Sequence, residues 1–157
     1  MRKFLTALLV VTLLAISILF VACQKFEGES AFDALKQLEE KGKIKLQYDE
    51  GVDIFFTSVK YKDVTLANDN AAGKYIGIFI NSDDEALQDP YGMCDSFEYD
   101  GEKFNYSGVA INKIPYTEGL KVIIALTEDV GNWHYAAVKD TVLLFTLPNG
   151  VKKTALN

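Results

Sequence analysis

Hydrophobic residues follow two different spacings after residue 30. Phe32, Leu35 and Leu38 are three positions apart, which is the spacing of one face of an α-helix. From Ile44 onward, apolar and polar residues alternate, which is typical of β-strands with one buried face. The pattern therefore predicts one helix followed by a series of strands.

The predicted helix has signals at both of its ends. Ser30 and Asp33 have the spacing of a capping box, in which two side chains bond the free backbone amides at the start of a helix. Gly42 is a residue type that commonly ends a helix. We therefore expect a helix over residues 31–41.

The predicted strands are short and closely spaced. They cover residues 44–48, 52–56, 59–61, 75–80, 120–126, 133–138 and 141–147, with a further one at Val109 and Ile111. Many short strands at near-regular spacing indicate a β-sandwich or a β-barrel. We expect a mainly β fold, an antiparallel immunoglobulin-like β-sandwich with one N-terminal helix. A small β-barrel and an α+β fold are the alternatives.

Two turn signals place strands in register. Asp100-Gly101 is typical of a two-residue hairpin turn. This turn predicts three cross-strand pairs: Tyr99 with Glu102, Glu98 with Lys103, and Phe97 with Phe104. Asn149-Gly150 is the second signal, and it predicts that residues 151–155 return against residues 141–147.

The N-terminus combines a basic start with a long apolar segment. Arg2 and Lys3 precede the apolar residues 4–22, and Cys23 follows them directly. This arrangement resembles the signal peptide of bacterial lipoproteins. The resemblance implies a signal peptide over residues 1–22 and a lipid-bearing tether over residues 23–29. The strand pattern and the absence of repeats or linkers predict a single β-rich domain over residues 30–157. An uncleaved membrane-spanning helix is the alternative, because residues 4–22 are long enough to cross a bilayer.

The same resemblance predicts where the protein resides. It implies diacylglycerol on the Cys23 sulfur, further acylation such as palmitate, and no other cofactor. The domain would then be extracytoplasmic, in the periplasm or cell envelope, with the membrane as its partner through the lipid. Gln24 stands where the inner-membrane retention signal has aspartate, which favours the outer membrane over the cytoplasmic membrane.

The net charge argues against one class of partner. The chain has a formal net charge of −6, and loss of Arg2 and Lys3 with the signal peptide would leave −8. A surface that is acidic on average repels nucleic acid and anionic headgroups. We therefore expect no nucleic-acid partner.

An acidic segment is the candidate metal site. Asp83, Asp84, Glu85 and Asp89 offer the carboxylate oxygens that calcium prefers. The order of acids and glycine found in EF-hand loops is missing. Ser82 and Glu85 also have capping-box spacing, which predicts a short helical turn with an exposed acidic face as the alternative.

Few residues are available for catalysis. His134 is the only histidine, and its alternation with Trp133 and Tyr135 directs it toward solvent. The chain has no G-x-S-x-G, P-loop or G-x-G-x-x-G motif, which argues against the common hydrolases and nucleotide enzymes. Cys94 is the second of two cysteines and is expected to be a buried small hydrophobe, with a reactive or intermolecular thiol as the alternative.

Aromatic residues are the candidate interaction surface. Phe55, Trp133 and Tyr135 could anchor an envelope protein or stack on a glycan, because aromatic residues are enriched in binding hot spots. Burial in a sandwich core is the alternative. The function that we expect is binding or envelope interaction without catalysis. A small-molecule or metal carrier associated with a transporter, and a carboxylate-dependent hydrolase, are the alternatives.

Overall fold

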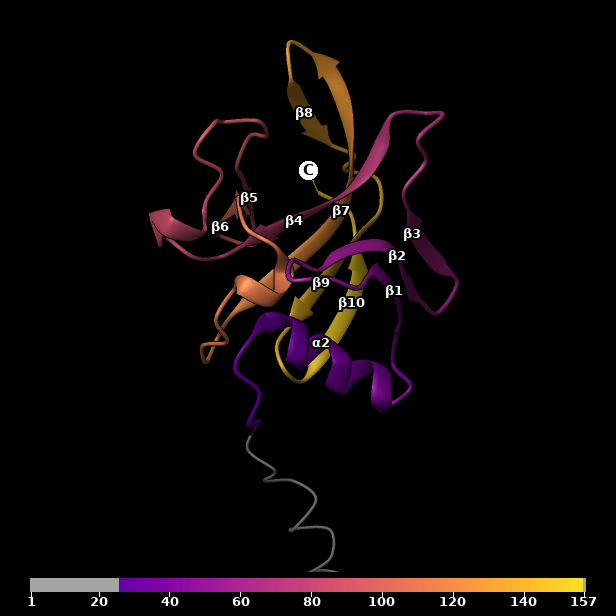
Figure 1. Ribbon diagram of the computed structural model, residues 1–157, viewed down its shortest axis with the longest axis vertical. Helices are drawn as coiled ribbons and strands as arrows, with labels where there is room; N and C mark the ends of the chain where they lie inside the picture. The colour runs from indigo at the N-terminus through magenta and orange to yellow at the C-terminus, as the bar shows by residue number, and fades with distance from the viewer. Residues whose placement is uncertain (1–25, 157) are drawn as a thin grey trace, which may run out of the picture.

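A computed structural model describes residues 26–156 of the chain (Figure 1). The predicted signal peptide, Cys23 and the first part of the predicted tether lie outside these residues. Within residues 26–156, no helix is both long enough and apolar enough to cross a membrane.

Two antiparallel β-sheets make up most of the described chain. The smaller sheet has the order β1-β2-β3, formed by β1 (Lys45–Asp49), β2 (Phe55–Tyr61) and β3 (Val64–Ala67). The larger sheet has the order β10-β9-β7-β4-β6-β5, and β8 also pairs with β7. Its strands are β4 (Lys74–Ile80), β5 (Phe97–Tyr99), β6 (Glu102–Tyr106), β7 (Lys121–Gly131), β8 (His134–Ala137), β9 (Val142–Thr146) and β10 (Gly150–Thr154). The predicted mainly β, antiparallel fold is confirmed.

The helix α2 (Ala31–Glu40) begins at the predicted capping box. The Ser30 hydroxyl accepts the Asp33 amide at 3.2 Å, and the Asp33 carboxylate accepts the Ser30 amide at 2.9 Å. The helix ends one residue earlier than predicted, and Gly42 follows with a φ of +69°, a conformation that glycine adopts without strain. Its buried face consists of Ala31, Ala34, Leu35 and Leu38.

The first hydrophobic core contains residues of α2 and of both sheets. Successive residues of a strand point to opposite faces of a sheet. On β7, Val122 and Ile124 therefore lie in the first core, where they meet Leu46 and Val59 of the smaller sheet. The two sheets are thus the layers of a sandwich, and α2 packs against the same cluster.

The other face of the larger sheet encloses a second core. Ile123 and Ala125 of β7 belong to it, with Phe79 and Phe104. The sheet curls far enough for its two edge strands to meet, because the Tyr99 hydroxyl of β5 lies 2.8 Å from the hydroxyl of Thr154 on β10. The larger sheet is therefore curled into a half-barrel, which is compatible with both a sandwich and the small barrel of the alternative prediction.

The β5–β6 hairpin has the register predicted from Asp100-Gly101. All three expected pairs are present: Phe97 with Phe104, Glu98 with Lys103, and Tyr99 with Glu102. The rings of Phe97 and Phe104 stack with their centroids 6.0 Å apart. The central residues Asp100 and Gly101 have φ values of +54° and +76°, as this type of turn requires.

The sequence prediction is wrong in several details. Residues 52–56 and 59–61 were expected as two strands but contribute to the single strand β2, β3 was not expected, and Trp133 lies in a turn and not in a strand. Val109 and Ile111 form no strand; Ile111 begins a short 3₁₀ helix, η2 (Ile111–Lys113), whose Asn112 side chain bonds the backbone of Val52 and Ile54. Those bonds hold residues 51–53 in a bend, so β2 begins only at Phe55.

Another difference concerns the turn that joins β9 to β10. Gly150 already pairs with Thr146, so the turn consists of residues 147–149 and not of Asn149-Gly150 alone. The predicted return of the last strand against β9 is confirmed.

Candidate functional site

The β7–β8 hairpin ends in an unusual turn. Gly131 pairs with His134, which leaves Asn132 and Trp133 as the two central residues. Their φ values are +57° and +62°, in the left-handed region that favours glycine. Trp133 is nevertheless a large residue, and it is 85% exposed. Local backbone strain therefore accompanies full exposure of the only tryptophan in the chain.

A β-bulge precedes this turn. Asp129 pairs with Tyr135 and Gly131 with His134, so Val130 has no partner on β8. The Asp129 carboxylate accepts the Gly131 amide at 2.7 Å and fixes the bulge. Bulges commonly change the direction of a side chain, and here Val130 is exposed near Trp133. We call Val130, Trp133 and Tyr91 the hairpin tip.

Tyr91 joins the hairpin tip through a neighbouring loop. The His134 ring approaches the Gly92 carbonyl at 3.1 Å through Nδ1 and the Asp95 carboxylate at 3.4 Å through Nε2. The Tyr135 amide also donates to the Met93 carbonyl at 2.6 Å. These contacts hold the loop that contains Gly92 and Met93 beside β8. Tyr91, which precedes Gly92, is 83% exposed.

The structure separates the three aromatic residues predicted as an interaction surface. Trp133 is at the hairpin tip, whereas Tyr135 is half-buried below it and packs edge-on against Tyr75 with centroids 6.5 Å apart. Phe55 is 58% exposed but lies on β2, in the other sheet. Val130 was not expected at this surface, because its exposure follows from a bulge that the sequence pattern does not show.

Cys94 is buried in the second core, as expected. It lines a polar pocket of about 190 Å³ together with Asp89, Asn105 and Tyr106. Burial, and after it the negative charges of Asp95 and Asp89, raise the pKa of the Cys94 thiol to about 11. The thiol is therefore protonated at neutral pH and is a poor nucleophile.

Two of the four predicted acidic metal candidates, Asp84 and Asp89, stabilise local turns. Asp84 caps the 3₁₀ helix η1 (Glu85–Leu87) by accepting the Ala86 amide at 3.0 Å; sequence analysis had expected Ser82 in that role. Asp89 accepts the amides of Tyr91 and Met93. Within residues 26–156, no three or more His, Cys, Asp or Glu side chains form a group that could hold a metal ion, and Asp83 and Glu85 join no such group.

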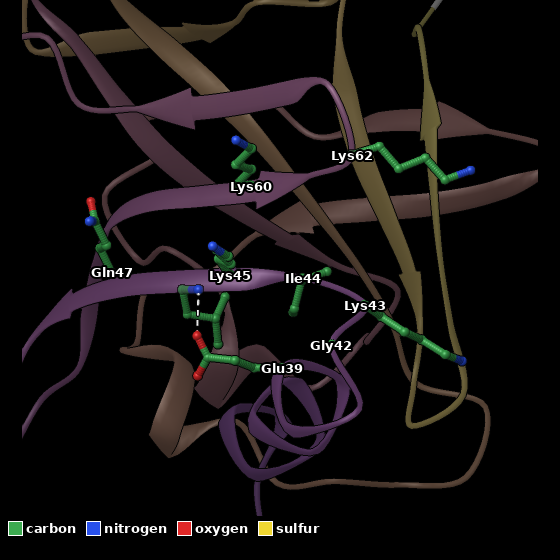
Figure 2. Close-up of a pocket in the computed structure, with 9 residues that line it drawn as sticks. Glu39, Gly42, Lys43, Ile44, Lys45, Gln47, Lys60 and Lys62 are labelled. Carbon is green, nitrogen blue, oxygen red and sulfur yellow. Dashed lines mark hydrogen bonds between the residues drawn. The ribbon is translucent and has the colours of Figure 1, made fainter.

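A groove on the smaller sheet is a site that sequence analysis missed. It has a volume of about 520 Å³ and is lined by Lys43, Lys45, Lys60 and Lys62, with Glu39 and Gln47 beside them (Figure 2). We call this site the lysine groove. The alternation of lysines with apolar residues is visible in the sequence, but their assembly depends on the pairing of β1 with β2. The chain therefore has a local basic surface at this groove although its net charge is negative.

Comparison of the chain with protein-family models, with curated proteins and with solved structures found no match, so the assignment of function depends on the geometry of these two sites.

Proposed function

We propose that this protein is a non-catalytic binding protein, held outside the cytoplasm by lipid on Cys23, whose hairpin tip docks onto a protein of the cell envelope. The observation that carries the proposal is Trp133, exposed at a left-handed backbone position. Strained residues persist where the surrounding structure enforces them, and they concentrate at functional sites. Tryptophan and tyrosine are also the residue types most enriched in binding hot spots.

The position of the hairpin tip suits a tethered protein. In Figure 1 the described chain starts next to α2, and the β7–β8 hairpin projects from the opposite end of the molecule. A domain attached to a membrane near its N-terminus would therefore present Trp133 away from that membrane. This arrangement favours a partner that lies beyond the lipid surface.

The His134–Asp95 pair supports the same function. Both ring nitrogens have neighbours, since Nδ1 contacts the Gly92 carbonyl and Nε2 contacts Asp95. The Asp95 side chain is 88% exposed. An exposed pair held in this way fits a clamp between the loop and the hairpin better than acid–base catalysis, which requires a site shaped around a substrate.

The single tryptophan makes docking directly measurable. 7-Azatryptophan incorporated in place of Trp133 can be excited separately from the tryptophans of a partner-containing envelope fraction, and its emission should shift to shorter wavelength on titration, because docking removes the ring from water. A photo-crosslinking amino acid at position 133 should then capture one discrete protein in intact cells. The matched control is the same amino acid at position 55, since Phe55 is also exposed but lies on the other sheet.

The outcomes separate the partner classes. A crosslinked product at position 133 that is absent at position 55 supports docking of a protein. An emission shift produced by purified envelope glycan alone would replace the protein partner by a glycan. Failure of both probes, or equal capture at positions 133 and 55, would refute the role of the hairpin tip.

The anchor has its own test. Radiolabelled palmitate should enter the wild-type protein and should not enter a Cys23→Ser variant. Equal labelling of both proteins, or none in either, would refute lipid attachment at Cys23 and leave the hairpin experiment unaffected.

A further inference from the structure

The lysine groove is built on the register of two strands. Lys45 of β1 pairs directly with Lys60 of β2, and both side chains point away from the sandwich core. Directly opposed side chains have Cβ atoms about 5 Å apart. Lys43 lies two residues before Lys45 and outside β1, and Lys62 lies in the turn directly after β2, so both lie near the end of the two strands at which Lys45 and Lys60 pair and line the same groove. Figure 2 shows Lys45 and Lys60 side by side, with Lys43 and Lys62 extending toward β9 and β10.

Two features of this arrangement oppose folding. Like charges that face each other across two strands repel, and Lys45 faces Lys60. Lys62 also has a φ of +53°, in the left-handed region where a long side chain is unfavourable and where glycine or asparagine is usual. Both departures from local preference fall in one groove, which indicates that the groove has a role other than stability.

The acidic residue in the groove is already occupied. Glu39 accepts the Leu46 amide at 2.8 Å through one oxygen and pairs with Lys36 at 2.5 Å through the other. Burial would raise the pKa of Glu39, but these bonds outweigh burial and hold the pKa below its usual value. Glu39 therefore remains charged, but its two oxygens already bond a residue of α2 and a residue of β1.

The four lysines of the groove lack acidic partners. Among the ion pairs of residues 26–156, none includes Lys43, Lys45, Lys60 or Lys62. The Lys43 ammonium donates to the Asn149 carbonyl at 2.9 Å, and the Lys62 ammonium lies 5.1 Å from the centre of the Tyr61 ring. Neither contact neutralises charge, so the groove has a positive potential.

The shape of the groove favours a linear ligand over a flat one. It continues into a second hollow of about 410 Å³, lined by Tyr61, Gly150 and Val151 and sharing Lys43 and Lys62. A bilayer is flat and would meet the acidic remainder of the surface as well as the lysines. A narrow polymer chain can enter the groove without contacting the acidic parts of the protein surface.

We propose that the lysine groove binds a linear phosphate polymer that carries no nucleobases. Lysine ammonium groups bind phosphate as compact point charges. Four ammonium groups distributed along one groove, which continues into a second hollow, suit successive phosphates of one chain better than a single small anion. The site is independent of the hairpin tip, so a Trp133→Ser variant should bind the polymer normally.

Long-chain inorganic polyphosphate is the probe. It should bind to the full-length protein purified in detergent, and orthophosphate at equal phosphate concentration should not compete. If about 0.7 counterions are released per neutralised phosphate, four lysines give a slope near −3 in a plot of log affinity against log salt. A Lys45→Gln/Lys60→Gln variant should lose about tenfold or more in affinity, and its slope should fall by about half.

The matched control is Lys103→Gln/Lys139→Gln, which removes the same charge from exposed positions outside the groove. It should bind polyphosphate like the wild type. Absence of polyphosphate binding, or equal weakening by both double variants, would overturn the proposal. Tighter binding of single-stranded DNA would assign the groove to nucleic acid instead. Protection of Lys45 and Lys60 from acetylation by anionic vesicles, but not by polyphosphate, would assign it to a membrane surface.

Discussion

Two hairpins of the larger sheet have the same type of turn but different sequences. The β5–β6 turn has Asp100 and Gly101 at its two left-handed positions, and its strands carry an opposite-charge pair and stacked aromatic rings. The β7–β8 turn has Asn132 and Trp133 at the same positions, next to a bulge. The first hairpin follows every local preference for stability, whereas the second exposes a large aromatic side chain where glycine would be more stable.

The difference shows where function is to be sought. A sequence that follows local preferences needs no explanation beyond folding. A sequence that departs from them at an exposed position requires another reason for the residue. The same contrast separates Glu98–Lys103, which attract each other, from Lys45–Lys60, which repel. The hairpin tip and the lysine groove are both identified by such departures.

The largest expected change in the free energy of unfolding is at the β5–β6 hairpin, whose sequence follows the local preferences for stability. Phe104 is fully buried, and Phe104→Ala should lower the free energy of unfolding by about 3–5 kcal/mol. Trp133→Ala at the other hairpin should change it by less than about 0.5 kcal/mol, because the side chain is exposed. Urea denaturation of both variants measures the two values. Comparable losses would show that Trp133 contributes to the core.

The second prediction concerns the core that the two hairpins share. Cys94, Phe97 and Tyr135 belong to it. Because the pKa of Cys94 is raised from 9.0 to about 11, its thiolate fraction at pH 8 should be about 100-fold below that of an unperturbed thiol. Alkylation of native Cys94 should be slowed at least as much, relative to the protein in urea. A native rate within tenfold of the unfolded rate would contradict the closed core.

The pH dependence of this core has a definite sign. Burial also raises the pKa of Tyr106, from 10.0 to about 12. Raised values favour the neutral forms of both groups in the folded state, so their contribution is complete below pH 9 and is lost as the pH rises through 11 and 12. Between pH 9 and 11, the free energy of unfolding of a Cys94→Ala variant should therefore fall less than that of the wild type. Any thiol that still reacts in this variant would be an unmodified Cys23.

A smaller effect is expected at the two turns themselves. Trp133→Gly should stabilise the protein by about 1 kcal/mol, because glycine relieves the left-handed strain, while it removes partner binding. Gly101→Ala places a side chain at the equivalent position and should destabilise by about 1 kcal/mol. The midpoints of urea unfolding test both changes. Destabilisation by Trp133→Gly would indicate that the indole stabilises the hairpin.

The smallest effect comes from exchanging charges across strands. Lys60→Glu should stabilise by about 0.2–1 kcal/mol, because it places a negative charge opposite Lys45. Lys103→Glu should destabilise by a similar amount, because it places a negative charge opposite Glu98. Thermal unfolding at low salt measures both shifts, and high salt should reduce them. Equal signs for the two variants would refute repulsion in the lysine groove.

Local signals predicted the parts of the fold that local chemistry determines. The capping box of Ser30 and Asp33, and the turn at Asp100-Gly101, are interactions within a few residues, and both are as expected. The strand predicted at Val109 and Ile111 is absent because two alternating apolar residues are compatible with a strand and with a 3₁₀ turn. Only the contact of Asn112 with residues 52 and 54 decides between them.

Both candidate sites depended on information that one segment does not contain. Trp133 was expected within a strand, because the usual turn residues gave no reason to place a tryptophan in a left-handed turn. The lysine groove required the register of β1 against β2, and this pairing shifts after Gln47. Tyr91 reached the hairpin tip through contacts of Gly92 and Met93 with β8. In each case the decisive contact joins residues far apart in the chain.

The bond between Tyr99 and Thr154 also has a consequence for synthesis of the chain. Its two residues are 55 positions apart, and the later one belongs to the last strand. A nascent chain that has completed β5 and β6 must wait for β10 before the edges of the larger sheet can meet. Until then the aromatic residues of the second core are exposed to solvent, and chaperones that hold unfinished chains would recognise this half of the protein.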